Sequence, residues 1–94
     1  MERRIQEILR SHKPLLRERF GVREIGVFGS YARGEESEGS DVDILVAFDE
    51  PVGWEFIDLK EFLERILGRP VDLGTTAALK PQLRETVLRE VVYV

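Results

Sequence analysis

The sequence predicts a small α/β fold of the α+β kind, with a mixed β-sheet flanked by helices. Apolar residues recur at helical spacing over residues 2–19, 54–67 and 81–89. Between them lie the short apolar runs EIGVF, DVDILVAF and PVDLG, which are typical of strands. Helices and strands therefore alternate along a chain of 94 residues. That length suits one domain with one core, residues 1–94.

The first helix is expected over residues 2–19, with Gly21 as its C-cap. Pro14 lies near its middle, which predicts a kink or a restart near Lys13, because proline removes a helical hydrogen bond. His12 is the only histidine. A lone histidine on a helix is expected to pack or to lie at the surface rather than to act as a ligand or a base.

A short strand is expected over residues 24–28, and it is expected to be central because it is apolar on both faces. Gly29 and Ser30 then open a helical turn that runs through Arg33. The residues that follow, 35–40, are polar and contain glycine, as expected of a loop.

The second half of the chain predicts a strand over residues 41–48, an amphipathic helix over 54–67 and a third strand over 70–74. Pro81 stands where the first residue of a last helix would be. The apolar residues 91–94 fit either a final short strand or the end of that helix.

The chain has no cysteine, which excludes disulfides and thiolate chemistry. No apolar run approaches the ~18 residues that a membrane span requires. The first residues, MERRIQEILR, do not have the pattern of a signal peptide. A cytoplasmic protein that does not enter a membrane is therefore expected.

The net charge of −4 conceals an uneven distribution. Residues 1–23 carry seven basic and three acidic side chains, whereas residues 35–64 carry eleven acidic side chains and one lysine. The acidic segment would attract cations and repel a nucleic-acid backbone. Nucleic-acid binding is therefore not expected.

Two aspartates, Asp41 and Asp43, stand two residues apart in the second predicted strand, so both point to one face. Paired carboxylates repel each other and are costly to desolvate without a counter-charge. A hard cation such as Mg²⁺ prefers oxygen ligands and keeps positions free for substrate phosphates. Taken alone, the pair fits a functional and a non-functional interpretation equally well.

Asp72 is a third carboxylate in an apolar strand. If its strand lies beside that of Asp41 and Asp43, the three side chains can share one site. Three carboxylates and two Mg²⁺ ions fit the two-metal scheme for in-line attack on phosphorus. Asp72 would then accept the proton of the attacking hydroxyl. The alternative is an aspartate at a strand end that faces solvent.

The turn before the first aspartate is suited to an anion. Gly29 lets a ligand approach the backbone, and the free N–H groups of the helix start can bind a phosphate. Ser30 has the chemistry of an N-cap, and a serine that caps a helix without any ligand is the common alternative. Arg33, three residues further on, fits either a phosphate contact or an ion pair with an aspartate or a nearby glutamate.

The motifs G-S-Y-A-R-G, S-D-V-D-I-L-V and V-D-L, in this order, resemble those of the polymerase-β-type nucleotidyltransferase superfamily. The short length and the G-S-x-A-R-G form resemble the minimal nucleotidyltransferase (MNT) proteins of prokaryotes. The resemblance covers residues 26–73 by motif and the whole chain by the order of its elements. It implies the nucleotidyltransferase core fold.

The resemblance also implies roles for the motif residues. Gly29 and Ser30 would hold nucleotide phosphates, and Asp41 and Asp43 would bind Mg²⁺. Asp72 would complete the metal site and activate the acceptor hydroxyl. MNT proteins often act as antitoxins beside a helical HEPN ribonuclease toxin, and some transfer AMP from ATP to a tyrosine of that toxin. The implied function is transfer of a nucleoside monophosphate, AMP from ATP, to a hydroxyl of such a partner.

Three alternatives remain open at this point. One is an antitoxin that neutralises its toxin by binding alone, although such a protein has no need of three clustered carboxylates. Another is a nucleotidyltransferase that acts on a small molecule or RNA within an oligomer, although no C-terminal acceptor-binding domain is expected from the sequence. The third is a globular domain without a metal. The base preference, the acceptor and the oligomeric state stay open.

Overall fold

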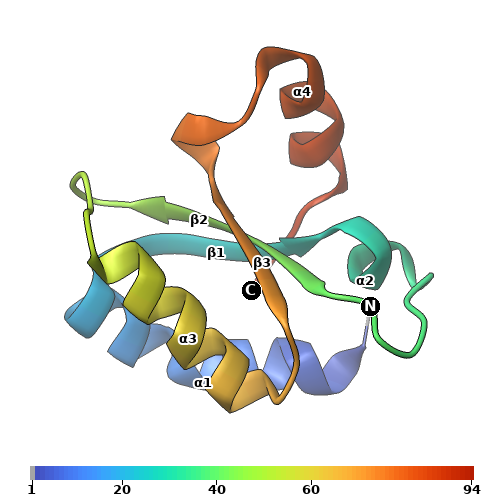
Figure 1. Ribbon diagram of the computed structural model, residues 1–94, viewed down its shortest axis with the longest axis horizontal. Coiled ribbons are helices and arrows are strands. Elements are labelled where there is room, and N and C mark those ends of the chain that lie inside the picture. The colour runs from blue at the N-terminus through green and yellow to red at the C-terminus, as the bar shows by residue number, and fades with distance from the viewer. Residues whose placement is uncertain (1) are drawn as a thin grey trace.

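The computed structural model describes residues 2–94, which form a four-stranded mixed sheet with helices on both faces (Figure 1). In chain order the elements are α1 (Arg3–Phe20), β1 (Val22–Phe28), α2 (Gly29–Arg33), β2 (Val42–Phe48), α3 (Glu55–Leu67), β3 (Val71–Thr75), the 3₁₀ turn η1 (Thr76–Ala78), α4 (Pro81–Glu90) and β4 (Val92–Tyr93). The strand order is β3-β2-β1-β4. This arrangement confirms the predicted fold class. None of the helices within residues 2–94 is long and apolar enough to cross a membrane.

Two helices, α1 and α3, pack on the same face of the sheet (Figure 1). Alternate residues of β2 point toward these helices and are buried, because side chains alternate across a strand. The core consists of buried side chains from both helices and from the strands, among them Ile5, Leu9, Leu16, Phe20, Val27, Ile44, Val46, Leu59, Leu63 and Leu67. The other residues of β2 therefore point to the opposite face of the sheet.

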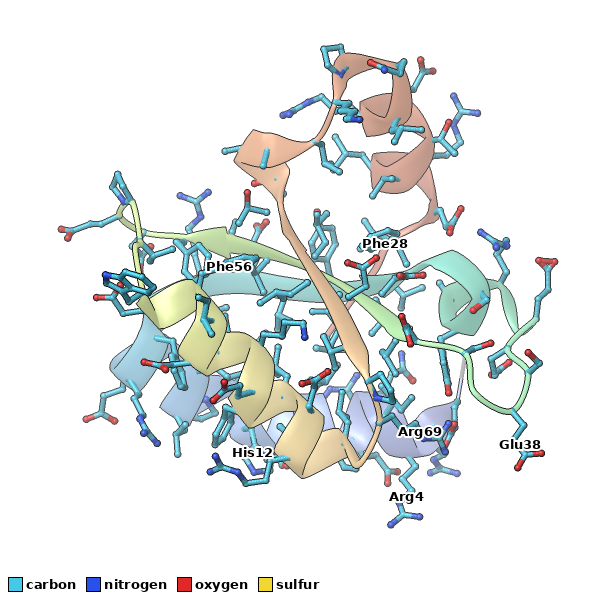
Figure 2. All side chains as sticks on the ribbon, in the orientation of Figure 1. Arg4, His12, Phe28, Glu38, Phe56 and Arg69 are labelled. Carbon is cyan, nitrogen blue, oxygen red and sulfur yellow. The ribbon has the colours of Figure 1, made fainter. Side chains whose placement is uncertain are left out.

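Helix α1 runs through Pro14 without interruption, so the helix does not restart near Lys13. Pro14 is exposed, and the one helical hydrogen bond that it removes does not end the helix. His12 (labelled in Figure 2) has Nδ1 2.8 Å from the carbonyl oxygen of Ile8. Its ring meets Phe62 edge-on, with 5.9 Å between the ring centroids. The packing role predicted for this histidine is confirmed.

The last residues form a strand rather than the end of a helix. β4 pairs antiparallel with β1, whose other neighbour is β2, so β1 is central as predicted. The N–H of Val94 also donates to the carbonyl oxygen of Ile25, at 3.1 Å. Because β3 and β4 lie at opposite edges of the sheet, α4 connects one edge to the other. Figure 1 shows α4 on the side of the sheet away from α1 and α3.

Candidate active site

The sheet register brings Asp43 and Asp72 side by side. β2 and β3 are parallel neighbours, and these two residues are direct partners in the pairing. Phe28 of β1 is the partner of Asp43 on the other side of β2. A row of three side chains therefore crosses three strands on the face away from α1 and α3, and Phe28 marks it in Figure 2.

Asp41 lies at the rim of this row. β2 begins at Val42, one residue later than predicted, so Asp41 precedes the strand and is exposed. Among residues 2–94, no three side chains of His, Cys, Asp or Glu lie close enough together to form a ready-made metal site. Asp41 and Asp72 nevertheless lie near enough to Asp43 for their charges to act on its carboxyl group. The exposed side chains of Asp41 and Asp72 can extend into solvent, and like charges favour their separation.

The carboxyl group of Asp43 is in an unfavourable environment for a negative charge. Partial burial raises its pKa, the charges of Asp72 and Asp41 raise it further, and Arg33 acts in the opposite direction. The result is a pKa of about 6. A cation beside these carboxylates would relieve this penalty, and an all-oxygen donor set fits a hard cation such as Mg²⁺. Perturbed carboxyls in such clusters are typical of functional sites.

The backbone at Gly29 lies directly against Asp43. Gly29 has a φ of 72°, a left-handed conformation that favours glycine. A Cβ atom at this position would overlap Oδ2 of Asp43 and would lie 2.9 Å from its Cγ. The Asp43 carboxyl therefore contacts the first residue of α2 in a space that only glycine leaves open.

The capping role considered for Ser30 is wrong. The N-cap of α2 is Phe28, and no side chain caps the helix. The helix begins two residues earlier than a serine cap would require, because Gly29 already makes the turn out of β1. Ser30 therefore lies within the first turn, and the common structural explanation for a serine at this position does not apply.

Tyr31 anchors helix α2 to the hydrophobic core, because its side chain is only 2% exposed. The hydroxyl of Tyr31 accepts a hydrogen bond from Nη1 of Arg69 (labelled in Figure 2). Arg69 also forms an ion pair with Glu2, at 3.3 Å. These contacts join the short helix to the segment just before β3 and to the start of α1.

Glu90 is a residue of this site that the sequence analysis did not identify. Its Oε1 accepts hydrogen bonds from the N–H of Gly29 and from Nη1 of Arg33, the latter at 2.8 Å. Nε of Arg33 also donates to Glu35, at 2.7 Å. Arg33 therefore pairs with two glutamates rather than with an aspartate. Because 61 residues separate Glu90 from Gly29, no local spacing in the sequence signals this contact.

A hollow of about 400 Å³ lies beside these contacts, between α2 and α4. Its lining comes from Ala32, Arg33, Thr86, Arg89 and Glu90. Neither this hollow nor two larger ones, of about 460 and 450 Å³, contains any of the three aspartates in its lining. The two arginines of the hollow between α2 and α4 are both paired with glutamates, Arg33 with Glu35 and Glu90 and Arg89 with Glu85.

Comparison with known proteins identifies the family. The model of the nucleotidyltransferase domain family matches residues 9–94. The chain belongs to this nucleotidyltransferase family. The nucleotidyltransferase is 63% identical, over 91 residues, to the protein adenylyltransferase MntA of Thermococcus cleftensis. The match covers 96% of this chain and 92% of that relative.

Solved structures share the fold of this nucleotidyltransferase. A proposed minimal nucleotidyltransferase is 43% identical with a TM-score of 0.76, over 95% of this chain and 87% of that one. A toxin–antitoxin crystal structure with AMP-PNP contains a chain that is 26% identical, with a TM-score of 0.70. That likeness covers 95% of this chain and 68% of the other. The family resemblance drawn from the sequence motifs is therefore confirmed.

Proposed function

We propose that this nucleotidyltransferase uses Mg²⁺ to transfer AMP from ATP to a hydroxyl of a partner protein, as the antitoxin of a HEPN toxin. The single observation that carries the proposal is the pairing of Asp43 with Asp72 beside the backbone of Gly29. The similarity to a protein named protein adenylyltransferase supports the reaction. The similarity to a toxin–antitoxin structure with AMP-PNP supports the nucleotide and the kind of partner.

The turn at Gly29 and Ser30 binds the nucleotide phosphates in this proposal. The N–H of Gly29 donates to a carboxylate oxygen of Glu90, so it points to a position that an anionic oxygen can occupy, which supports this role. Arg33 donates to the same oxygen and would neutralise phosphate charge. Ser30, which is not needed as a cap, supplies a hydroxyl in the same first turn.

Asp41, Asp43 and Asp72 would hold Mg²⁺, with two ions in the full arrangement. When bound, the metal supplies charge neutralisation to the phosphates and to the negative charge that develops on them. Asp43 is suited to be the central ligand, because it is the most buried of the three and its neighbours already disfavour an uncompensated charge. Asp41 and Asp72 are exposed on either side of it.

Asp72 would also accept a proton in the transfer step. The oxygen of the acceptor hydroxyl forms a bond to the α-phosphorus of ATP, and the bond from that phosphorus to the bridging oxygen of the β-phosphate breaks. Pyrophosphate leaves, and the hydroxyl proton moves to the Asp72 carboxylate. Asp72 belongs to β3, an edge strand, and its exposed side chain is accessible to a hydroxyl on another protein.

The test is incubation of the protein with labelled ATP and Mg²⁺, with and without its HEPN-type partner. Asp43→Asn should lower transfer to the partner by at least about a hundredfold, because it removes a charged group from the reacting site. Asp49→Asn is the matched control, since Asp49 is an exposed aspartate at the other end of β2. Normal transfer by the Asp43 variant would refute the assignment.

The same experiment separates the alternative functions. Tight binding of the toxin without any transferred label would indicate an antitoxin that acts by contact alone. Label that appears on RNA or on a small molecule, and not on the partner, would indicate a different acceptor. Transfer that needs both the partner and Asp43 supports the proposed function.

A further inference from the structure

Glu90 holds the position at the α2 turn where an incoming anion would be expected. Its Oε1 accepts from the N–H of Gly29 and from Nη1 of Arg33, so a backbone donor and a cationic donor converge on one oxygen. A phosphate oxygen has the same requirements as this carboxylate oxygen, namely a negative charge and two N–H donors. The contact therefore resembles what a nucleotide phosphate would form at this turn.

Glu90 uses two donors that a nucleotide phosphate would also need, the N–H of Gly29 and the guanidinium of Arg33. Gly29, which donates to it, also has its Cα against the carboxyl of Asp43. Glu90 therefore lies beside the turn that adjoins the proposed metal-binding carboxylate. Arg33 is the cation that offsets the charge of Glu90, and a nucleotide would need the same arginine.

The helix that carries Glu90 is not fixed by a core of its own. α4 has no buried residue, and Leu83 and Leu88 are among the exposed apolar side chains of the protein. Glu90 is the last residue of α4. It accepts a hydrogen bond from the α2 turn and forms an ion pair with Arg33 of α2. Few buried apolar contacts mean that a local displacement of α4 costs little free energy.

We infer that Glu90 is an internal competitor of the nucleotide, which occupies the place of a phosphate oxygen and must leave the Gly29 N–H and Arg33 before ATP binds. The inference rests on the proposed function, because it concerns the affinity of the same site. In this role Glu90 does not contact the bound nucleotide. It lowers the affinity of the site for triphosphates. Arg33 then exchanges Glu90 for phosphate when ATP enters.

The test measures nucleotide binding to Glu90→Gln by isothermal titration calorimetry, with AMP-PNP and Mg²⁺ and with the full chain. Glutamine has the shape of glutamate and no charge, so it competes less well for Arg33 and Gly29. The variant should bind AMP-PNP about tenfold more tightly than the wild type, which corresponds to the loss of one charge-assisted contact from the free protein. Inorganic triphosphate should gain in affinity to a similar extent, whereas adenosine, which has no phosphate, should not.

Glu61→Gln is the control, because Glu61 is an exposed glutamate of α3, on the face of the sheet away from α4. Its affinity for AMP-PNP should equal that of the wild type. If the wild type and Glu90→Gln bind AMP-PNP equally well, the inference is wrong and the proposed function stands. If neither protein binds AMP-PNP, both the inference and the proposed function are overturned.

A measurement on the wild type keeps the inference testable should Glu90→Gln fold poorly. Binding of AMP-PNP should speed amide hydrogen exchange in the last turn of α4, because the nucleotide displaces the carboxylate that secures it. Exchange in β1 and β2 should stay as slow as before. Slower exchange in α4 on nucleotide binding would contradict the inference, since it would mean that the contact with Glu90 is kept.

Discussion

Three separate requirements meet at Gly29. Its φ of 72° favours glycine, its Cα lies against the carboxyl of Asp43, and its N–H donates to Glu90. Each requirement alone is common in proteins. Together they make this residue the point at which the metal-binding carboxylate and the phosphate-binding turn of the proposed site are set relative to each other.

Gly29→Ala should destabilise the protein more than the same change at Gly34. Both residues have a φ of 72°, so alanine costs about 1–2 kcal/mol at either position through the backbone. At Gly34 a Cβ atom meets nothing within 4 Å, whereas at Gly29 it overlaps the carboxyl of Asp43. The free energies of unfolding in urea should differ between the two variants, and the excess loss at position 29 should shrink when Asp43→Ala is added. Equal losses for the two alanine variants would show that the close approach to Asp43 has no energetic weight.

The raised pKa of Asp43 should make the metal-free protein less stable as the pH rises. The pKa is about 6 in the folded protein against an ordinary value of 3.8, so the folded state binds more protons between these values. The penalty is absent below about pH 4, grows as the pH rises through this interval and is complete above about pH 6.

Asp43→Asn should therefore stabilise the metal-free protein at about pH 8 and leave its stability unchanged at about pH 4. The rise from 3.8 to about 6 corresponds to about 3 kcal/mol, at about 1.4 kcal/mol per pKa unit. Because the side chain is only half-buried, solvent screening reduces the expected gain to about 1 kcal/mol. Urea unfolding with EDTA at the two pH values measures it, with Asp49→Asn as the control. A variant that is less stable than the wild type at the higher pH would contradict this account.

The stability of helix α2 depends on contacts with residues outside the helix. It has five residues, which is too short for a helix to be stable on its own, and it has no side-chain N-cap. Its position comes from buried Tyr31 and from the hydrogen bond between Tyr31 and Arg69. Sequence spacing predicts that a turn begins at Gly29, but it cannot show that a residue 38 positions away anchors it.

Tyr31→Phe should keep the fold and loosen this helix. Phenylalanine fills the same buried space and lacks the oxygen that accepts from Arg69. A fall in the melting temperature of a few degrees is expected, in line with the loss of one hydrogen bond in a small domain. The KM for ATP should rise with little change in kcat, because α2 carries the proposed phosphate-binding groups. Tyr93→Phe, at an exposed tyrosine, should change neither quantity, and an identical response of the two variants would show that the Arg69 contact does not position the turn.

The features of the fold that the sequence predicts are those that depend on the local spacing of residues. The period of apolar residues predicts α1, α3 and the central strands, and the spacing of Asp41 and Asp43 predicts that they share a face. A site shared by Asp43 and Asp72 requires β3 to lie beside β2, and the parallel pairing of these two residues meets that condition. The position of Asp41 outside β2 depends on where the pairing begins, which local spacing does not determine.

The unpredicted features arise from contacts between distant parts of the chain. The apolar residues 91–94 fit a strand or a helix end equally well, and only the free edge of β1 decides for a strand. That strand in turn fixes where the end of α4 lies, and so where Glu90 meets Gly29. The sequence of α4 contains no pattern that distinguishes Glu90 from Glu85, the other acidic residue of this helix.

Because Glu90 lies close to β4 in the chain, its competition with ATP does not depend on the protein concentration. Only Val91 separates them, and β4 is hydrogen-bonded to the central strand, so the carboxylate is tethered within a small volume around the turn. A tethered group acts at an effective concentration in the millimolar range or above, and that value does not change when the protein is diluted. Under this inference, the ATP concentration that displaces the carboxylate is a property of each molecule and does not depend on how many copies a cell contains.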